Sequence, residues 1–427
     1  MSAQTMVNAY TPGKGNLTPS DEARVARRTR LLGPAYRLCY ETPVHFVRGE
    51  GVWLYDAAGQ AYLDCYNNVA SLGHCHPHVV AATARQSALY ASHTRYLHDT
   101  VLDYAERLLA TFPAALSHVM FTCTGSEAND LALRVAFAHT GGAGVIVTEN
   151  AYHGVTLATS SMSPSLGAGV PLGVQVRTVP APQDAAGFAR DVQAAIDDLT
   201  RHGIKPAALL VDTIFSSDGV FADPAGFLQP AVAAIRAAGG VFIADEVQPG
   251  FGRTGDAMWG FQRHGLVPDM VSMGKPMGNG YPVAGLVLQP EVIAAFGARA
   301  RYFNTFGGNA VAAATAMAVL EVIEGEGLQA NAARVGGHFR DGLLALAGAH
   351  DCLGPLRAAG LFLGQDIVTD GQPDPVKAGR IVNRLRENHI LISATGVLGH
   401  VLKIRPPLVF TTAHVDRVLE GLRLALL

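Results

Sequence analysis

Residues 240–285 read GVFIADEVQPGFGRTGDAMWGFQRHGLVPDMVSMGKPMGNGYPVAG, and two apolar runs within them decide the fold. The first run, 241–244, ends in Asp245, as expected of a buried parallel strand that delivers a carboxylate to a site. The second run, 270–273, leads to Lys275, which stands alone among glycine and proline residues. A desolvated lysine is a poor structural residue but a good nucleophile. We therefore expect the two strand ends to present a carboxylate and an amine to one covalently bound ligand.

The regions around this stretch predict an α/β fold, with a large, mostly parallel sheet and a smaller α+β domain. Apolar runs at 118–122, 145–149 and 207–215 alternate with helical patterns such as 228–240, which is typical of a parallel sheet. Shorter strands and helices follow after about residue 330. The expected organisation is a flexible arm at 1–20, an N-terminal segment of the small domain at 21–90, a large domain at 91–325 and a C-terminal small domain at 326–427.

The segment TGSEAND (124–130) places small and hydroxyl residues between a strand and a helix. Backbone N–H groups and the positive end of the helix dipole converge there, and Gly125, with Ser126 beside it, lets a phosphate come close. An ordinary helix cap explains the same residues equally well, because Thr124 and Ser126 are good caps. Tyr152 follows the next strand, where it either stacks on a planar ring or forms part of the core.

The segment SLGHCHPH (71–78) contains histidines and a cysteine that look like metal ligands. Their spacing matches no common zinc pattern, and Pro77 is expected to break any helix that would align them. We therefore expect a loop beside the site and no metal.

Arg405 follows an apolar run in LKIRPPLVF (402–410). Arginine is well suited to bidentate carboxylate binding, although a surface arginine in an edge strand would have the same sequence context. The glycines form no GxGxxG pattern after the first strand, and Lys275 lacks the frame of a P-loop lysine. Neither a dinucleotide site nor a P-loop is therefore predicted.

A phosphate cradle, an aromatic platform, a buried acid and a solitary lysine together fit one cofactor, pyridoxal 5′-phosphate. Asp245 would pair with the pyridine nitrogen and keep it protonated, so that the ring withdraws electrons. Lys275 would form the resting Schiff base, leave when a substrate amine displaces it, and then move protons between carbons. Val247 would pack on the ring face opposite Tyr152, and Gln248 would hydrogen-bond the phenolic oxygen.

From about Arg28 to its end, the chain resembles a class III aminotransferase of the fold type I pyridoxal-phosphate family. Its resemblance to the alanine–glyoxylate aminotransferase 2-like branch rests on CYNNVASLGHCHPHVV (65–80) and RYLHD (95–99). That branch contains transaminases and also phospho-lyases that act on phosphoethanolamine and phosphohydroxylysine. The motifs that carry the family resemblance are TGSEAND (124–130), AYHG (151–154), FIADEVQPGFGRTG (242–255), SMGKPMGNGYP (272–282) and FNTFGGN (303–309).

The resemblance implies a homodimer, or a dimer of dimers, with active sites at the interface. Thr305 would then reach the cofactor phosphate of the neighbouring subunit, and His153 of the AYHG motif would also contact the cofactor. One departure is Asp212, because many relatives carry glutamate in that strand; the shorter acid puts a glutamate–arginine switch for dicarboxylates in doubt. The substrate-binding residues that the resemblance implies are Asn67, Asn68, Leu97 and Arg405.

Three functions fit these residues. Transamination would move an amino group from an amino acid or ω-amine, including diamino and β-amino acids, to pyruvate, glyoxylate or 2-oxoglutarate, with Arg405 as the carboxylate anchor. A phospho-lyase would expel phosphate from an amine such as phosphoethanolamine, with Arg95 and Arg405 as candidate cations. Lyases of this branch tend to carry lysine at the position of Arg405, which favours transamination. A non-catalytic binding protein would not need Asp245 and Lys275.

The bulk composition favours a cytoplasmic oligomer. Hydrophobic residues make up 49% of the chain and charged residues 16%, against about 25% charged in an average domain. No apolar run approaches the ~18 residues of a membrane span, so we expect a subunit interface to cover the apolar surface. The net charge of −3 gives no sign of nucleic-acid binding. Five scattered cysteines and a polar N-terminus predict the cytoplasm, without a disulfide framework or signal peptide.

Overall fold

The computed structural model describes residues 6–427, and its largest element is a seven-stranded sheet. Its strands are β4 (His118–Thr122), β5 (Gly144–Thr148), β6 (Val176–Val179), β7 (Pro206–Asp212), β8 (Val241–Asp245), β9 (Met270–Met273) and β10 (Ala284–Leu288). They lie in the order β4-β10-β9-β8-β7-β5-β6. Strands β5 to β9 run parallel, whereas β10 is antiparallel to β9 and β4. The mostly parallel sheet predicted from the sequence is therefore confirmed.

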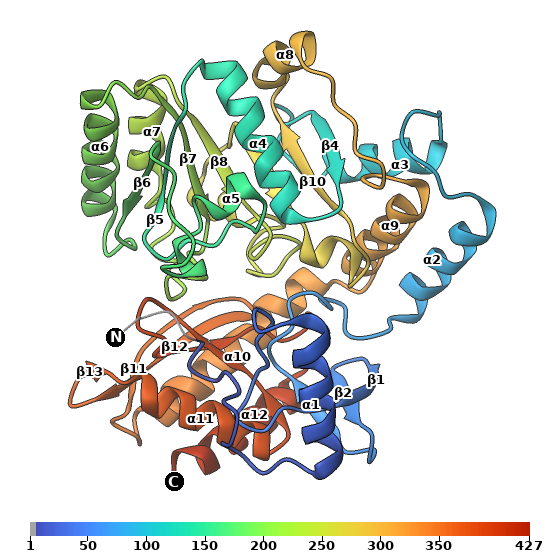
Figure 1. The fold of residues 1–427 in the computed structure, drawn as a ribbon, viewed down its shortest axis with the longest axis vertical. Coiled ribbons are helices and arrows are strands. Elements are labelled where there is room, and N and C mark those ends of the chain that lie inside the picture. The colour runs from blue at the N-terminus through green and yellow to red at the C-terminus, as the bar shows by residue number, and fades with distance from the viewer. Residues whose placement is uncertain (1–5) are drawn as a thin grey trace.

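Helices cover both faces of this sheet (Figure 1), which is why its inner strands, β5 and β7 to β10, are buried along almost their whole length. Helix α4 (Gly125–Thr140) packs on one face, and α6 (Ala185–Arg201) and α7 (Gln229–Ala237) pack on the other. Side chains of β8 alternate between the two faces, with Val241 and Ile243 on the side of α4. Asp245, the last residue of the strand, continues this alternation on the side of α4.

The other helices of this body surround the large sheet. Helix α9 packs against α2 and α3, and α8 packs against α4. These elements are α2 (Pro77–Leu89), α3 (Asp99–Leu109), α5 (Leu157–Ser160), α8 (Pro290–Arg299), α9 (Ala310–Gly325) and the 3₁₀ helices η1 (Pro164–Leu166), η2 (Gly260–His264) and η3 (Lys275–Gly278).

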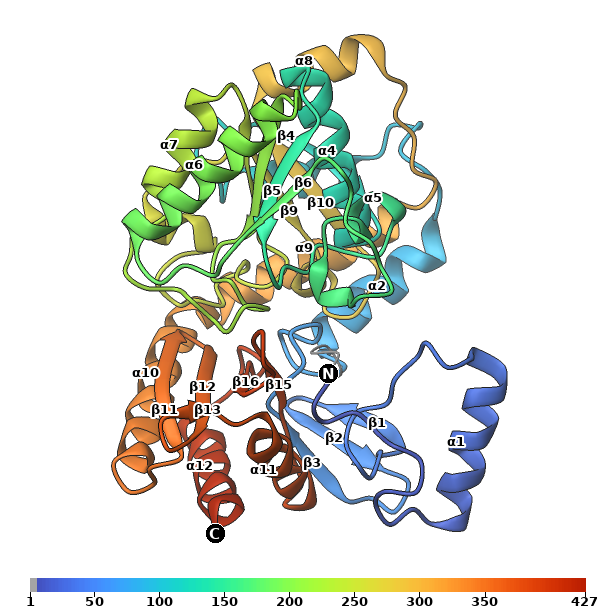
Figure 2. The ribbon, with the colours of Figure 1, turned by 60° about the vertical axis from the view of Figure 1, so that its left-hand side comes forward.

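A second body, lower in Figures 1 and 2, joins the two ends of the chain. Strand β14 of the C-terminal region pairs in parallel with β3, in the sheet β1-β2-β3-β14, and β11-β12-β16-β15 form another sheet. The predicted antiparallel meander is β1 to β3. The strands are β1 (Phe46–Glu50), β2 (Trp53–Asp56), β3 (Ala61–Asp64), β11 (Leu353–Ala359), β12 (Phe362–Thr369), β13 (Gln372–Pro373), β14 (Ile390–Leu391), β15 (Ser393–Thr395) and β16 (Val401–Ile404). The helices are α1 (Pro19–Leu32), α10 (Leu328–Ala347), α11 (Pro375–Glu387) and α12 (Thr412–Leu426).

The turn after β7 connects the two bodies at the carboxyl ends of the parallel strands. Backbone oxygens of Ser217 and Gly219 accept hydrogen bonds from Gly396 N at 3.1 Å and from Arg357 Nε at 2.9 Å. Both donors belong to the second body. The end of the large sheet that carries the predicted site residues therefore faces the second body.

Two expectations about secondary structure are wrong. Pro77 does not break a helix but begins α2, because proline has no N–H to lose at a first helical position and already has a helical φ. The strand expected at 207–215 ends at Asp212, whose carboxylate accepts hydrogen bonds from Ile214 N at 3.1 Å and Ser216 N at 3.0 Å. These bonds stabilise a turn in place of further strand.

The predicted arm, 1–20, lies partly outside the described residues, which begin at Met6. Asn8 is fully buried, and Ala9 forms a β-bridge with Cys39, so this part of the arm is ordered against the rest of the chain. The domain limits themselves stay a prediction. No helix in the described part of the chain is long and apolar enough to cross a membrane.

Candidate active site

A cavity of about 320 Å³ opens at the carboxyl ends of β8 and β9. It brings together residues that are more than a hundred positions apart in the sequence. Further lining residues include Cys123, Thr124, Asn129, Asp212 and Tyr281. Eight of the residues predicted to bind the cofactor line it: Gly125, Ser126, Tyr152, His153, Asp245, Val247, Gln248 and Lys275.

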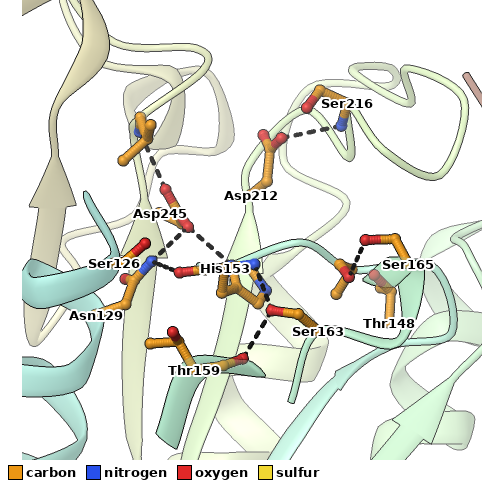
Figure 3. A network of polar contacts seen from close by, with 12 residues as sticks. Ser126, Asn129, Thr148, His153, Thr159, Ser163, Ser165, Asp212, Ser216 and Asp245 are labelled. Atoms are coloured by element: carbon orange, nitrogen blue, oxygen red, sulfur yellow. Dashed lines mark hydrogen bonds and ion pairs between the residues drawn. The ribbon is translucent and has the colours of Figure 1, made fainter. Parts of the chain in front are cut away.

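Asp245 ends β8 and is surrounded by donors (Figure 3). Its Oδ2 accepts a hydrogen bond from Asn129 Nδ2 at 2.8 Å and lies 2.8 Å from His153 Nδ1, while Oδ1 accepts from Val247 N at 3.1 Å. A carboxylate has no hydrogen to give, so Nδ1 of His153 is the donor in that contact. These contacts fix the orientation of the carboxylate, and His153 reaches the site through it. The alternation along β8 explains the Asn129 contact, because Asp245 lies on the face that α4 covers.

Lys275 begins η3 in a strained conformation, with φ of 30°. Within residues 6–427 its ammonium makes no hydrogen bond and no ion pair, although it is half-buried. The pKa of Lys275 is lowered to about 8, first by burial and then by the charge of Arg405, against the opposing effects of Asp245 and Asp212. A lysine with these properties is a nucleophile near neutral pH.

The N-terminus of α4 is both a capped helix end and an open anion site. Thr124 is the cap: its side chain accepts from Glu127 N, and the Glu127 carboxylate accepts in return from Thr124 N. The N–H groups of Gly125 and Ser126 have no partner in the described residues and are free for a phosphate. The two interpretations left open by the sequence are therefore compatible, since one residue caps the helix and the next two remain available.

Space around this helix end is restricted. A Cβ on Gly125 would lie 2.8 Å from Val247 Cγ2, and a Cβ on Gly154 would lie 2.6 Å from Ser126 Oγ. Ser126 Oγ itself accepts a hydrogen bond from Val155 N at 3.1 Å. Only glycine fits at these two positions. Because neither glycine has a side chain, the free N–H groups of Gly125 and Ser126 stay accessible.

Gln248 connects the cavity to the predicted substrate residues. Its Oε1 accepts hydrogen bonds from Arg405 Nη1 at 2.6 Å and from Asn68 Nδ2 at 3.2 Å. Arg405 follows β16 and is 7% exposed, so it is not a surface arginine. Its Nε donates to the carbonyl of Tyr66 at 2.8 Å. The guanidinium therefore bonds neutral acceptors and has no carboxylate within ion-pair distance in the described chain.

Lys403 is a buried cation that the sequence analysis missed. It is 7% exposed, and its Nζ lies 5.7 Å above the ring of Phe362, with no ion pair in the described part of the chain. Burial lowers its pKa well below the usual range, and the charges of Arg405 and Asp212 also act on it. The signal was its spacing, because Lys403 in β16 and Arg405 just after it are two positions apart, which places them on one face of extended chain.

The other predicted residues do not line the cavity, and neither do Asn68 and Arg405, which lie behind Gln248. Asn67 bonds Asp64, with Nδ2 to Oδ2 at 2.9 Å, and supports the loop before Asn68. Leu97 is 96% exposed and lines a different, smaller cavity. Thr305 is exposed and does not line the cavity of its own chain.

The histidines of 71–78 pair with separate carboxylates. His74 Nε2 lies 2.7 Å from Asp64 Oδ2, and His78 Nε2 lies 2.6 Å from Glu321 Oε2. His76 Nε2 lies 3.5 Å from Glu326. These side chains contact different elements and do not converge on one point.

The fold and the cavity together define a fold type I pyridoxal-phosphate enzyme. The chain belongs to the class III aminotransferases, because the family model "Aminotransferase class-III" matches residues 38–426. This family depends on pyridoxal 5′-phosphate. The residues present fit that group: free N–H groups for the phosphate, an unpaired lysine for the aldehyde, an oriented carboxylate for the ring nitrogen, and Tyr152, half-buried, beside the ring site.

Named relatives have two kinds of activity. A protein called alanine–glyoxylate aminotransferase 2-like from Drosophila melanogaster is 39% identical over 93% of this chain and 85% of its own. Human mitochondrial alanine–glyoxylate aminotransferase 2 is 33% identical over 92% of this chain and 84% of its own. A solved phospholyase from Arthrobacter, in complex with phosphoethanolamine, is 41% identical over 94% of this chain and 99% of its own, with a TM-score of 0.92.

Proposed function

We propose that the protein is an aminotransferase that moves an amino group from an amino acid or carboxylate-bearing ω-amine to a keto acid such as pyruvate, glyoxylate or 2-oxoglutarate. The observation that carries this proposal is the buried pair Lys403 and Arg405, which has no acidic partner in the described residues; the charge of Arg405 also acts on Lys275. Such a pair is suited to hold the carboxylate of the amino donor and then that of the keto acid.

The roles of the chain's own groups follow from their positions. Lys275 Nζ would take the proton from the amine-bearing carbon and return a proton to the acceptor carbon, and its pKa of about 8 suits both steps near neutral pH. Asp245, with its fixed orientation, would hold a proton on the ring nitrogen. When bound, the cofactor supplies an electron sink for the charge that develops at that carbon.

The test uses the purified holoenzyme and the absorption of its cofactor. Added amino donors should convert the cofactor to its amine form, and pyruvate or glyoxylate should reverse the change. Lys275→Ala should lower the rate of transfer at least about 10²-fold, because it removes the proton carrier, whereas Lys377→Ala, on α11 and outside the cavity, should not. A cofactor that no amine converts would rule out transamination.

A phospho-lyase is the second candidate. The same two cations would accept a phosphate as readily as a carboxylate, and the Arthrobacter protein described above is a phospholyase. That reaction needs no keto acid. Release of inorganic phosphate from phosphoethanolamine, without any keto acid and with loss of release in Lys275→Ala, would favour the lyase over the transaminase.

We also propose a homodimer with shared active sites, in the cytoplasm. Thr305 and Phe306 are exposed in the single chain, and so are the large apolar side chains of Leu97 and Leu157. A partner subunit that covers them would account for the high apolar content. Sedimentation of the holoenzyme would measure the oligomeric state, and cell fractionation would test the location, since a human relative is named as mitochondrial.

A further inference from the structure

The amide of Gln248 is held in one orientation by the residues behind it. Gln248 lines the cavity with Lys275 and Asp245, and its Oε1 accepts hydrogen bonds from both Arg405 Nη1 and Asn68 Nδ2. Both partners are donors, so only the oxygen of the amide can meet them. The amide nitrogen, Nε2, is left as the group that can donate into the cavity.

Arg405 is itself fixed by the protein, with no substrate required. Its backbone N donates to the carbonyl of Cys65 at 3.0 Å, its Nε donates to Tyr66 O at 2.8 Å, and its guanidinium lies 4.5 Å above the Tyr66 ring. The carbonyl of the next residue, Pro406, accepts a hydrogen bond from the buried Arg253. A side chain that only waited for a substrate carboxylate would not need a guanidinium nitrogen committed to Gln248.

We propose that Arg405 is a positioning residue for the cofactor. By holding Gln248 Oε1, it directs Gln248 Nε2–H towards the phenolic oxygen of pyridoxal 5′-phosphate and strengthens that donor through the charge-assisted bond behind it. Asn68 supports the same amide oxygen from a second direction. The proposal extends the proposed function and rests on the cofactor being held by Lys275, but it does not depend on the identity of the amine.

The experiment measures the pH at which the visible absorption of the substrate-free holoenzyme changes. A donor to the phenolic oxygen stabilises the anionic form of that oxygen, so its loss should raise the pKa of the lysine–cofactor link by about one unit. We expect this rise in Arg405→Gln and in Gln248→Ala. In the double variant the rise should be smaller than the sum of the two single rises, because Arg405 then has no amide to position and retains only its direct charge effect.

The double-variant cycle removes the contribution of neighbouring groups. Asp212, Asp245 and Lys403 also act electrostatically on the site, but they are the same in all four proteins. Arg236→Gln is the matched control, because Arg236 lies on α7 and pairs with Asp269 away from the cavity. In Arg236→Gln the visible absorption should change at the same pH as in the wild type.

Two results would overturn the proposal. If the shifts in the pKa of the lysine–cofactor link add up in the double variant, Arg405 acts directly through its charge. If Arg405→Gln leaves that pKa unchanged and only raises KM, Arg405 is a substrate anchor alone. If Arg405→Gln fails to fold, Gln248→Glu tests the donor to the phenolic oxygen, because glutamate keeps the contact with Arg405 but has no N–H. The pKa of the lysine–cofactor link in Gln248→Glu must then rise as it does in Gln248→Ala. An unchanged pKa contradicts the proposal. The protein could also show non-additive shifts of the pKa of the lysine–cofactor link and yet transfer no amino group. That result would overturn the proposed function and support this inference.

Discussion

At the scale of single residues, burial has shifted several charged groups towards neutral pH. Burial lowers the pKa of Lys275 to about 8, raises that of Glu246 to about 8 and raises that of Asp218 to about 7. Of the three, only Lys275 lines the cavity. Glu246 instead accepts hydrogen bonds from the backbone of η2 and is part of the scaffold. Position relative to the cavity therefore separates a reactive group from a structural one with a similar shift.

The reactivity of Lys275 should depend on pH with a midpoint near 8. Only the neutral amine attacks an aldehyde, so the rate at which cofactor-free protein captures pyridoxal 5′-phosphate should rise with pH and level off above about pH 8. A model lysine peptide, with a pKa of about 10.4, should keep rising beyond that point. Stopped-flow absorption gives both profiles, and identical midpoints would show that the protein does not lower this pKa.

Asp218 should make the protein less stable as pH rises. It is 7% exposed, and its carboxylate accepts hydrogen bonds from Thr148 Oγ1 at 2.8 Å and Asn150 N at 3.2 Å. Its folded pKa of about 7 lies above the unfolded value of about 3.9. Between these two pKa values the folded state binds one more proton than the unfolded state. The free energy of unfolding therefore falls as pH rises from about 4 to about 7, by at most about 1.4 kcal/mol per pH unit.

Asp218→Asn should remove this part of the pH dependence. Asparagine can accept from Asn150 N with its oxygen and donate to the Thr148 hydroxyl, so both contacts survive. In urea unfolding of cofactor-free protein at pH 5, 6 and 7, the free energy of unfolding of the variant should increase relative to that of the wild type as pH rises. Asp374→Asn is the control, because the pKa of Asp374 is lowered by its hydrogen bond from Lys377 N, and its effect should stay constant over this range. Parallel curves for Asp218→Asn would refute the assignment.

At the scale of elements, the N-terminus of α4 combines a cap and an anion site because Thr124 and Glu127 satisfy each other. Thr124 caps only Glu127 N, so the N–H groups of Gly125 and Ser126 stay free in the described residues. The same local sequence therefore stabilises the helix and leaves donors for the expected phosphate. The neighbouring β8 delivers Val247 against this turn, which sets how much space remains.

Gly125→Ala should weaken cofactor binding by roughly tenfold, equivalent to about 1.4 kcal/mol, within the usual range for overpacking. The added Cβ would meet Val247 Cγ2 at 2.8 Å, so one of the two must move. Gly297→Ala in α8 is the matched control, because no atom lies within 4 Å of its new Cβ. Fluorescence titration of cofactor-free protein measures the dissociation constants. Equal affinities in the two variants would show that this gap has no role in binding.

At the scale of the whole molecule, one chain forms the cavity but leaves Thr305 outside it. The proposed homodimer predicts that Thr305 serves the partner's site. Lys275→Ala and Thr305→Ala, each defective alone at limiting cofactor, should then complement each other when mixed and re-associated. Each hybrid has one site with both native residues, so activity should recover to about a quarter of the wild-type value.

Mixing each variant with itself is the control for this experiment. A site built within one chain predicts no recovery, because every site would then lack either Lys275 or Thr305. Sedimentation of the mixture should confirm that hybrids have formed before activity is compared.

The sequence signals for the expected reacting groups are local, and the structure brings those groups together in one cavity. An apolar run that ends in Asp245, a second that leads to Lys275, and a hydroxyl–glycine turn before a helix each depend on neighbours within a few residues. Local patterns failed where a local rule has a positional exception, as at Pro77, which begins a helix that we expected it to break.

What the sequence alone determined was the chemistry: a lysine, a carboxylate and a phosphate cradle, hence the cofactor and the family. Only the tertiary structure decided which groups support them. Arg405 reaches Gln248 across 157 positions, and Asn129 reaches Asp245 across 116. Such pairs depend on which strand ends and helix faces meet, and that follows from strand order and the contact between the two bodies. The proposed substrate cations illustrate this, because Lys403 and Arg405 belong to the second body whereas Asp245 and Lys275 belong to the first.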